Sequence, residues 1–123
     1  MKVLVDTDVI IDALRGVKKA IHMLAKLREE NELLISGITE MELMAGRDAS
    51  DKRKRELILS FLSKFRKVNP TNETFKLAGE LRRKYDISPP DCIIAATAVL
   101  EGAKLLTRNL RDFKRIKEVE LLG

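Results

Sequence analysis

Cysteine, histidine and tryptophan are scarce in this chain of 123 residues, which has one cysteine, one histidine and no tryptophan. The single cysteine, Cys92, cannot form a disulfide within the chain, and this favours a reducing compartment. Zinc sites built from Cys and His are excluded, because they need several such ligands. A Ser-His-Asp triad would have to use His22. We expect Cys92 to pack in the core and His22 to lie at the surface.

Long uninterrupted apolar runs are also missing. The first apolar stretch, residues 3–14, is broken by Asp6, Asp8 and Asp12. Carboxylates at this spacing exclude a signal peptide or a membrane span in that stretch. We therefore expect a cytoplasmic protein that does not associate with a membrane.

Charge, by contrast, is abundant. Charged residues make up 35% of the chain, the net charge is +5 and the pI is about 9.5. A basic protein attracts polyanions, so nucleic acid is a natural partner, although a lysine-rich surface also serves solubility. Hydrophobic residues make up 45% of the chain, enough for the core of a single domain over residues 1–123.

Short apolar runs alternate with amphipathic segments along the whole chain. This alternation predicts an α/β fold in which a parallel sheet of about five strands has helices on both faces. The expected strands are residues 2–5, 33–36, 66–68, 104–107 and 119–122. The expected helices are residues 8–15, 17–30, 38–45, a segment ending near residue 62, 71–81 and 88–100.

Two of the expected helices begin with a capping signal. Asp8 follows the first strand and is expected to cap the first helix through its carboxylate. Ser88 precedes Pro89, Pro90 and Asp91, which combines a capping hydroxyl, prolines in the first turn and an acid at the positive end of the helix dipole. The helix that follows is apolar on nearly every side, so we expect it to be buried.

Acidic and amide side chains follow the first and fourth expected strands. Asp6 comes directly after the first strand, Asn109 and Asp112 come after the fourth, and Asp91 opens the apolar helix. Ligands of open α/β sheets bind beyond the carboxyl ends of the strands. If the first and fourth strands are neighbours, these side chains meet at one edge of the sheet.

A glutamate on the third expected helix is a further candidate. The helical neighbours of Glu42 include Ile38 and Ala45, so its side chain should point toward small and apolar groups, whereas Glu40 projects from nearly the opposite face. We therefore expect Glu42 in the site and Glu40 at the surface. Each acid taken singly is explained by helix capping or ion pairing, and only the combination indicates a site.

The chemistry of such a cluster points to a divalent cation. Neighbouring carboxylates cannot all stay ionised without a proton or a cation between them. Oxygen ligands without histidine or thiolate favour Mg²⁺ or Mn²⁺ over zinc. A metal-bound water can attack a phosphodiester in line while the ion stabilises the developing charge. The number of ions, one or two, stays open.

Four segments together resemble the PIN-domain nucleases, and within them the VapC-type toxins of toxin–antitoxin pairs. They stand in the order typical of that family and span nearly the whole chain: residues 3–10 (VLVDTDVI), 36–46 (SGITEMELMAG), 87–98 (ISPPDCIIAATA) and 106–113 (LTRNLRDF). The resemblance implies a PIN-like sheet of about five parallel strands and Mg²⁺- or Mn²⁺-dependent ribonuclease activity.

The resemblance also implies a role for each polar residue of these segments. The acids that it assigns to catalysis are Asp6, Glu42, Asp91 and Asp112, with Asp6 and Asp91 as the direct metal ligands. The groups expected to support them, by orienting carboxylates or waters, are Thr7, Asp8, Ser36, Thr107 and Asn109.

VapC-type toxins resemble one another in their partners as well. They form homodimers, are held by a VapB-type antitoxin and usually cut tRNA or other structured RNA. The resemblance therefore implies an RNA substrate, with tRNA as one possibility, a cognate VapB-type antitoxin and a homodimer.

Three alternatives share part of the pattern. A haloacid dehalogenase-type phosphotransferase also starts with a strand followed by Asp-x-Asp, as at Asp6 and Asp8, but this chain is short for that fold. A receiver-type phosphoacceptor needs an acid after its third strand, where Asn69 and Pro70 stand. A non-catalytic RNA- or protein-binding module could keep the PIN fold, although the presence of all the expected acids argues against it.

Overall fold

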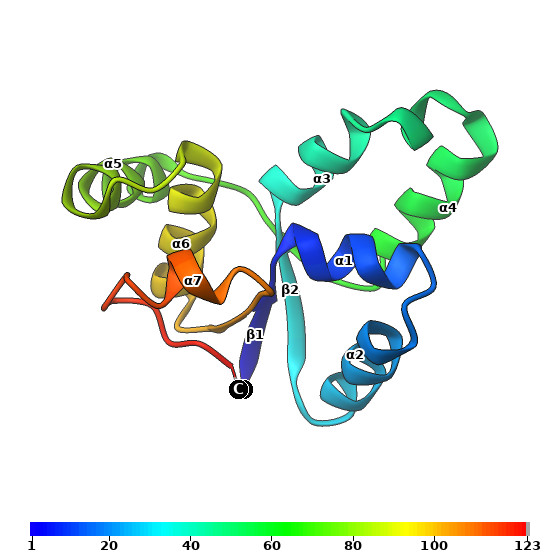
Figure 1. The fold of residues 1–123 in the computed structure, drawn as a ribbon, viewed down its shortest axis with the longest axis horizontal. Coiled ribbons are helices and arrows are strands. Elements are labelled where there is room, and N and C mark those ends of the chain that lie inside the picture. Colours follow the sequence, from blue (N-terminus) through cyan, green and yellow to red (C-terminus); the bar gives the residue numbers. More distant parts are fainter. Residues whose placement is uncertain (123) are drawn as a thin grey trace.

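A parallel sheet runs through the middle of the computed structural model, which describes residues 1–122 (Figure 1). Its strands lie in the order β3-β2-β1-β4, and every pair is parallel. The first and fourth strands are therefore neighbours, as the site prediction required. The bounds of the strands are β1 Lys2–Val5, β2 Glu32–Ser36, β3 Arg66–Val68 and β4 Lys104–Leu106.

The fifth expected strand is not formed. Leu121 makes only an isolated parallel bridge to Leu105. The Leu105 N–H donates to the Glu120 carbonyl, and the Leu122 N–H donates to the Leu105 carbonyl, each at 2.9 Å. Because the chain touches β4 at this one point, the apolar pattern of residues 119–122 reflects packing against the sheet edge and not a full ladder.

The strands are buried on both faces, which is typical of parallel sheets. Val3 and Val5 belong to one apolar cluster, and Leu4 belongs to another on the opposite face. Helices cover both faces, as predicted, with α1 to α4 on one side of the sheet in Figure 1 and α5 to α7 on the other. The helices are α1 Thr7–Leu14, α2 Lys18–Glu30, α3 Gly37–Met44, α4 Lys52–Leu62, α5 Asn72–Tyr85, α6 Pro89–Glu101 and α7 Leu110–Phe113, with a 3-10 turn, η1, at Arg47–Ser50.

The N-cap of the first helix lies two residues earlier than expected. Asp6, not Asp8, is the N-cap of α1, and its carboxylate accepts a hydrogen bond from the Thr7 N–H at 2.8 Å. Strand β1 ends at Val5, so only one residue separates the strand from the helix. Asp8 falls in the first turn, where a carboxylate still favours the positive end of the helix dipole.

The start of α6 also differs from the prediction. The Ser88 side chain makes no capping hydrogen bond, although Pro89 and Pro90 do occupy the first turn. A capping side chain bonds the N–H of the second or third helical residue, and Pro90 at the second position has none. The Ser88 side chain instead acts on Asp91, where it lowers the pKa of the carboxyl group and so opposes the effect of burial. The helix itself is buried as expected.

None of the helices within residues 1–122 is long and apolar enough to cross a lipid bilayer.

Truncation of the central sheet should be costly. Leu34 on β2 is completely buried, so Leu34→Ala should lower the free energy of unfolding by about 2–5 kcal/mol through lost burial and the cavity left behind. Leu100, whose residue surface is 47% exposed, provides the matched control, and Leu100→Ala should change stability by no more than about 0.5 kcal/mol. Urea unfolding measures both, and equal losses would contradict this account of the core.

Candidate active site

Asp6 lies where β1 and the neighbouring edge strand β4 end side by side. Val5 pairs with Leu106, and the Asp6 N–H continues the ladder by donating to the Leu106 carbonyl at 2.9 Å. The Asp6 carboxylate is fixed through both oxygens: the Thr7 N–H donates to one and the Thr107 hydroxyl to the other, each at 2.8 Å. Asp6 is 6% exposed, so this carboxylate is held rigidly in a nearly dry position.

The loop after β4 brings in the next polar groups. Thr107 accepts a hydrogen bond from the Asn109 N–H at 3.0 Å while its hydroxyl proton is directed to Asp6. The Asn109 side-chain amide donates to the Asp112 carboxylate at 3.1 Å. Asp8 accepts from the Arg108 N–H at 3.1 Å and so ties α1 to this loop. Thr107, Asp8 and Asn109 therefore each bond a neighbouring group of this loop or of Asp6, and their supporting role in the site stays a prediction.

Glu42 reaches the site from α3. The Thr7 hydroxyl donates to the Glu42 carboxylate at 2.7 Å and lies 2.9 Å from the Thr39 hydroxyl. Glu40 turns away and pairs with Lys67 at 3.4 Å. The two glutamates therefore lie as the sequence analysis placed them relative to Thr7 and Lys67, and a role for Glu42 in the site stays a prediction.

Around α3, three details differ from the sequence analysis. Glu42 is exposed at the rim and not packed among apolar groups. Ser36 supports the site indirectly, because its hydroxyl caps α3 by accepting from the Ile38 N–H at 3.1 Å and bonds no carboxylate of the described chain. Thr39, completely buried, was missed. A threonine one helical turn before Glu42 was the available signal.

Five carboxylates influence one another electrostatically in this region. Burial raises the pKa of Asp6 from 3.8 to about 6, and the charges of Asp8 and Asp91 add to the rise, while the bonds from Thr107 and Thr7 oppose it. Burial also raises the pKa of Asp91, and the charges of Asp112, Glu42 and Asp8 raise it further. The acidic residues brought together are Asp6, Asp8, Glu42, Asp91 and Asp112.

The donor set suits a hard divalent cation. No three acidic, histidine or cysteine side chains within residues 1–122 form a ready-made cage for an ion. Mg²⁺ does not require one, because it keeps several waters and takes one or two carboxylates directly. Mutual repulsion accounts for carboxylates that gather without closing into a cage. Asp6 and Asp91, whose pKa values are both raised by burial and by neighbouring carboxylates, fit the role of the direct ligands.

The residues expected outside the site lie outside it. Cys92 is buried in α6, and its thiol donates to the Ile87 carbonyl at 3.3 Å. His22 is exposed on α2. No imidazole therefore stands among the carboxylates.

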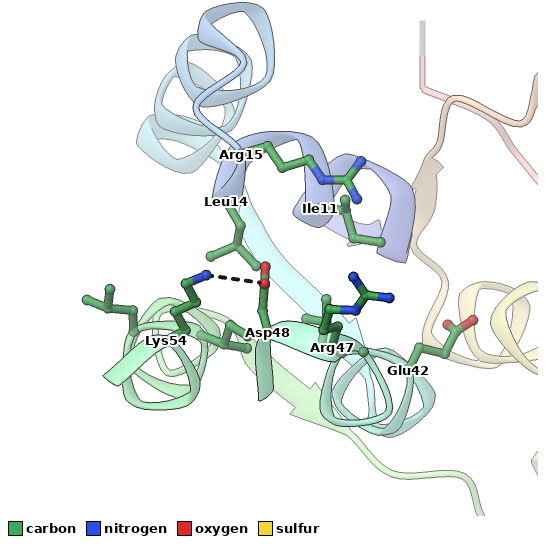
Figure 2. Close-up of a pocket in the computed structure, with 11 residues that line it drawn as sticks. Ile11, Leu14, Arg15, Glu42, Arg47, Asp48 and Lys54 are labelled. Carbon is green, nitrogen blue, oxygen red and sulfur yellow. Dashed lines mark ion pairs between the residues drawn. The ribbon is translucent and has the colours of Figure 1, made fainter. Parts of the chain in front are cut away.

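A pocket of about 520 Å³ adjoins the acidic cluster and shares Glu42 with it (Figure 2). Its lining comes from α1, α3, η1 and α4 and combines charged with apolar side chains. Of the acidic side chains, Glu42 is the one that also lines this pocket, so the pocket lies on the Glu42 side of the cluster.

The sequence profile of the PIN domain family matches residues 3–119. Ribonuclease VapC10 of Mycobacterium tuberculosis is 33% identical over 124 aligned positions, which cover 96% of this chain and 90% of that protein. The tRNA(fMet)-specific endonuclease VapC of Salmonella typhimurium is 29% identical, with 98% and 96% covered. In structure, VapBC2 from Rickettsia felis bound to a DNA fragment from its promoter superimposes with a TM-score of 0.86 at 28% identity, covering 99% and 98%.

The fold and the site thus define a class of protein: an α/β domain with acidic side chains at the carboxyl ends of its strands. The chain belongs to the PIN-domain family and, within it, to the VapC-type ribonucleases. The resemblance carried by the four sequence segments is confirmed. This membership sets aside the phosphotransferase and receiver alternatives, which have other folds.

Neutralising Asp6 should stabilise the metal-free protein. The folded-state pKa of Asp6 is raised, so folding binds extra protons between pH 4 and 6 and stability falls as the pH rises through that window. In EDTA at pH 7, Asp6→Asn should therefore raise the free energy of unfolding by about 1–3 kcal/mol, and the gain should vanish below pH 4.

Thermal unfolding from pH 3.5 to 8 measures this gain. The exposed Asp48 offers the control, because Asp48→Asn removes one carboxylate that pairs only with Lys54, at 3.7 Å, within the described chain. Added Mg²⁺ should stabilise the wild type and not Asp6→Asn. A destabilised Asp6→Asn protein at pH 7 would refute the electrostatic account.

Proposed function

We propose that this chain is an endoribonuclease that depends on Mg²⁺ or Mn²⁺ and acts as the toxin of a VapBC-type pair. The observation that carries the proposal is the meeting of carboxylates from four separate segments around Asp6, at the carboxyl ends of β1 and β4. Membership of the VapC-type ribonucleases supports the reaction class. The oxygen-only donor set supports the choice of cation.

Each side chain has a distinct part in the proposed hydrolysis. Asp6 and Asp91 would hold the cation, which when bound polarises the phosphodiester and acidifies water. The hydrogen bonds from Thr7 and Thr107 fix the Asp6 carboxylate, so the position of the ligand is set before substrate arrives.

Glu42 and Asp112 would act on the attacking water. Thr7 holds Glu42 and Asn109 holds Asp112, so each carboxylate keeps one oxygen free to accept a proton. Of the two, Glu42 is the more exposed, which suits a group that meets solvent water at the rim. The absence of an imidazole among these carboxylates in the described chain is consistent with water, and not the ribose hydroxyl, as nucleophile.

The proposed substrate is RNA, and structured RNA such as tRNA in particular. The net charge of +5 favours a polyanion despite the acidic site. The name of the Salmonella relative specifies a transfer RNA, and this supports the choice of substrate class.

The proposed partners are a VapB-type antitoxin and a second copy of the chain. The structural relatives named as VapBC complexes support the antitoxin. Exposed apolar side chains such as Met41 and Leu57, at 55% and 63% exposure, provide surface for such contacts. We also propose that the protein works in the cytoplasm and does not associate with membranes, in keeping with its lone cysteine and lack of spanning helices within residues 1–122.

Two glutamates on one helix provide the sharpest test of the site. Glu42→Gln should lower kcat for RNA cleavage in Mn²⁺ by about 10²–10⁴-fold, because it removes a proton acceptor. Glu40→Gln, the same chemical change two residues away on the Lys67 side, should leave kcat within about twofold. Asp6→Asn and Asp91→Asn should abolish cleavage, and EDTA should do the same to the wild type. Equal kcat values for the two glutamine variants would contradict the assignment.

The ends of the products test the identity of the nucleophile. Hydrolysis by water leaves a simple phosphate monoester on one fragment, whereas attack by the neighbouring ribose hydroxyl leaves a cyclic phosphate. We expect cleavage of total RNA in Mn²⁺ to yield no cyclic phosphate, as read by end mapping. RNA binding without any cleavage when Mn²⁺ is added would instead support the non-catalytic alternative.

A further inference from the structure

Two arginines face the pocket that adjoins the acidic site. Arg15 follows the last turn of α1 and Arg47 opens η1, so they are far apart in sequence but line the same hollow. Figure 2 shows them reaching in from opposite walls, with both guanidinium groups on the side of the pocket nearer Glu42. Two cationic side chains thus lie in the pocket that Glu42 shares with the acidic cluster.

These arginines differ from the neighbouring cations in having no ion-pair partner within residues 1–122. Lys54, in the same pocket, pairs with Asp48 at 3.7 Å, and Arg108, beside the site, pairs with Asp12 at 3.1 Å. Neither Arg15 nor Arg47 has a carboxylate within 4.0 Å in the part of the chain that the structure describes. Their charge is therefore available to an external anion.

The site needs such cations if a polyanion is to approach it. Five carboxylates gather at this edge, and every nucleotide of an RNA adds a negative charge. A divalent ion compensates only the phosphate at its own position. The neighbouring phosphates require fixed positive groups on the flanks of the cluster, since charges within a few ångströms act most strongly where solvent is partly excluded.

We propose that Arg15 and Arg47 bind the phosphate next to the one that is cut, on the Glu42 side. Guanidinium groups bind phosphate through paired N–H donors, and two of them on opposite walls can hold one phosphate in a defined register. Apolar side chains, Ile11, Leu14 and Leu43 among them, line the same pocket and pair with no charge, so they leave the two guanidinium groups free for an anion. This assignment rests on the proposed ribonuclease function and specifies how the substrate is positioned for it.

An acidic segment of a partner protein could also pair with two arginines. RNA is the better match, because a strand that places one phosphate at the carboxylates must place its next phosphate close by. The pocket begins at Glu42 itself, within reach of such a strand. A partner protein is therefore an outcome to be tested and not the assignment.

Binding in EDTA isolates this contribution from catalysis. A labelled single-stranded RNA of about a dozen nucleotides should bind Arg15→Ala/Arg47→Ala on the order of 10- to 100-fold more weakly than the wild type. If both arginines hold one phosphate, the slope of log K against log salt should fall by about 0.7. Two separate phosphates would give about twice that change. Arg15→Lys/Arg47→Lys, which keeps the charges and loses the paired donors, should restore only part of the affinity.

A double variant on α2 provides the matched control. Lys19→Ala/Lys26→Ala removes the same charge from exposed positions on α2, outside the pocket. It should weaken RNA binding by less than about threefold. Thermal unfolding verifies that both doubles remain folded.

Substrates in which one phosphodiester is replaced by a neutral linkage identify the phosphate that the arginines bind. In Mn²⁺, a methylphosphonate at the linkage next to the cleaved one should raise KM for the wild type and have no further effect in the arginine double. A neutral linkage several nucleotides away should affect both proteins alike. The arginine double itself should raise KM with kcat nearly unchanged, since the contact exists before and during the reaction.

The outcomes separate this inference from the proposed function. The phosphate assignment is wrong if the arginine and lysine double variants weaken RNA binding equally. It is also wrong if the arginine double variant loses binding to a cognate antitoxin and keeps its affinity for RNA. Neither result would contradict metal-dependent cleavage. A third outcome has two parts: only the arginine double variant loses RNA affinity in EDTA, and the wild type does not cleave RNA in Mn²⁺. This outcome would support the phosphate-binding site and contradict the proposed ribonuclease activity.

Discussion

The parallel pairing of β1 with β4 is the constraint on which the site depends. It places Asp6 and Thr107 at the same level of the sheet, although 101 positions separate them along the chain. The bond from the Asp6 N–H to the Leu106 carbonyl extends the ladder by one residue, so Asp6 is anchored to the sheet itself. Because helices cover both faces of the sheet, this anchor adjoins the packed core on both sides.

Burial makes the ionisation of Asp6 unfavourable in the metal-free protein. A carboxylate that is nearly dry and close to other carboxylates resists ionisation, and the pKa of Asp6 rises to about 6. The hydrogen bonds from Thr7 and Thr107 only partly compensate. In the proposed function a bound cation would offset this cost, so the burial and charge that disfavour ionisation of Asp6 in the metal-free protein would also favour metal binding. Asp6 would then connect the stability of the protein with its proposed chemistry.

The sequence predicted the gross arrangement well because strand and helix periods are local. The four paired strands, the two covered faces and the gathering of Asp6, Glu42, Asp91 and Asp112 at one edge all followed from pattern and motif. The errors concern choices between equivalent local signals. Asp6 and Asp8 are both acceptable caps, and the short connection after β1 selects Asp6. The apolar run near Leu121 could form a strand or a single bridge, and only contact with β4 decides which.

What the sequence determined by itself is the inventory: oxygen donors without histidine at strand ends, a basic surface for a polyanion, and apolar runs of the right period for a covered parallel sheet. What the tertiary structure decided is adjacency. Thr39 beside Thr7, Asn109 on Asp112, and Arg15 facing Arg47 across one pocket join elements whose separation in the chain carries no local signal. Side-chain hydrogen bonds and charges act over a few ångströms, so their partners are fixed only when packing sets the distances.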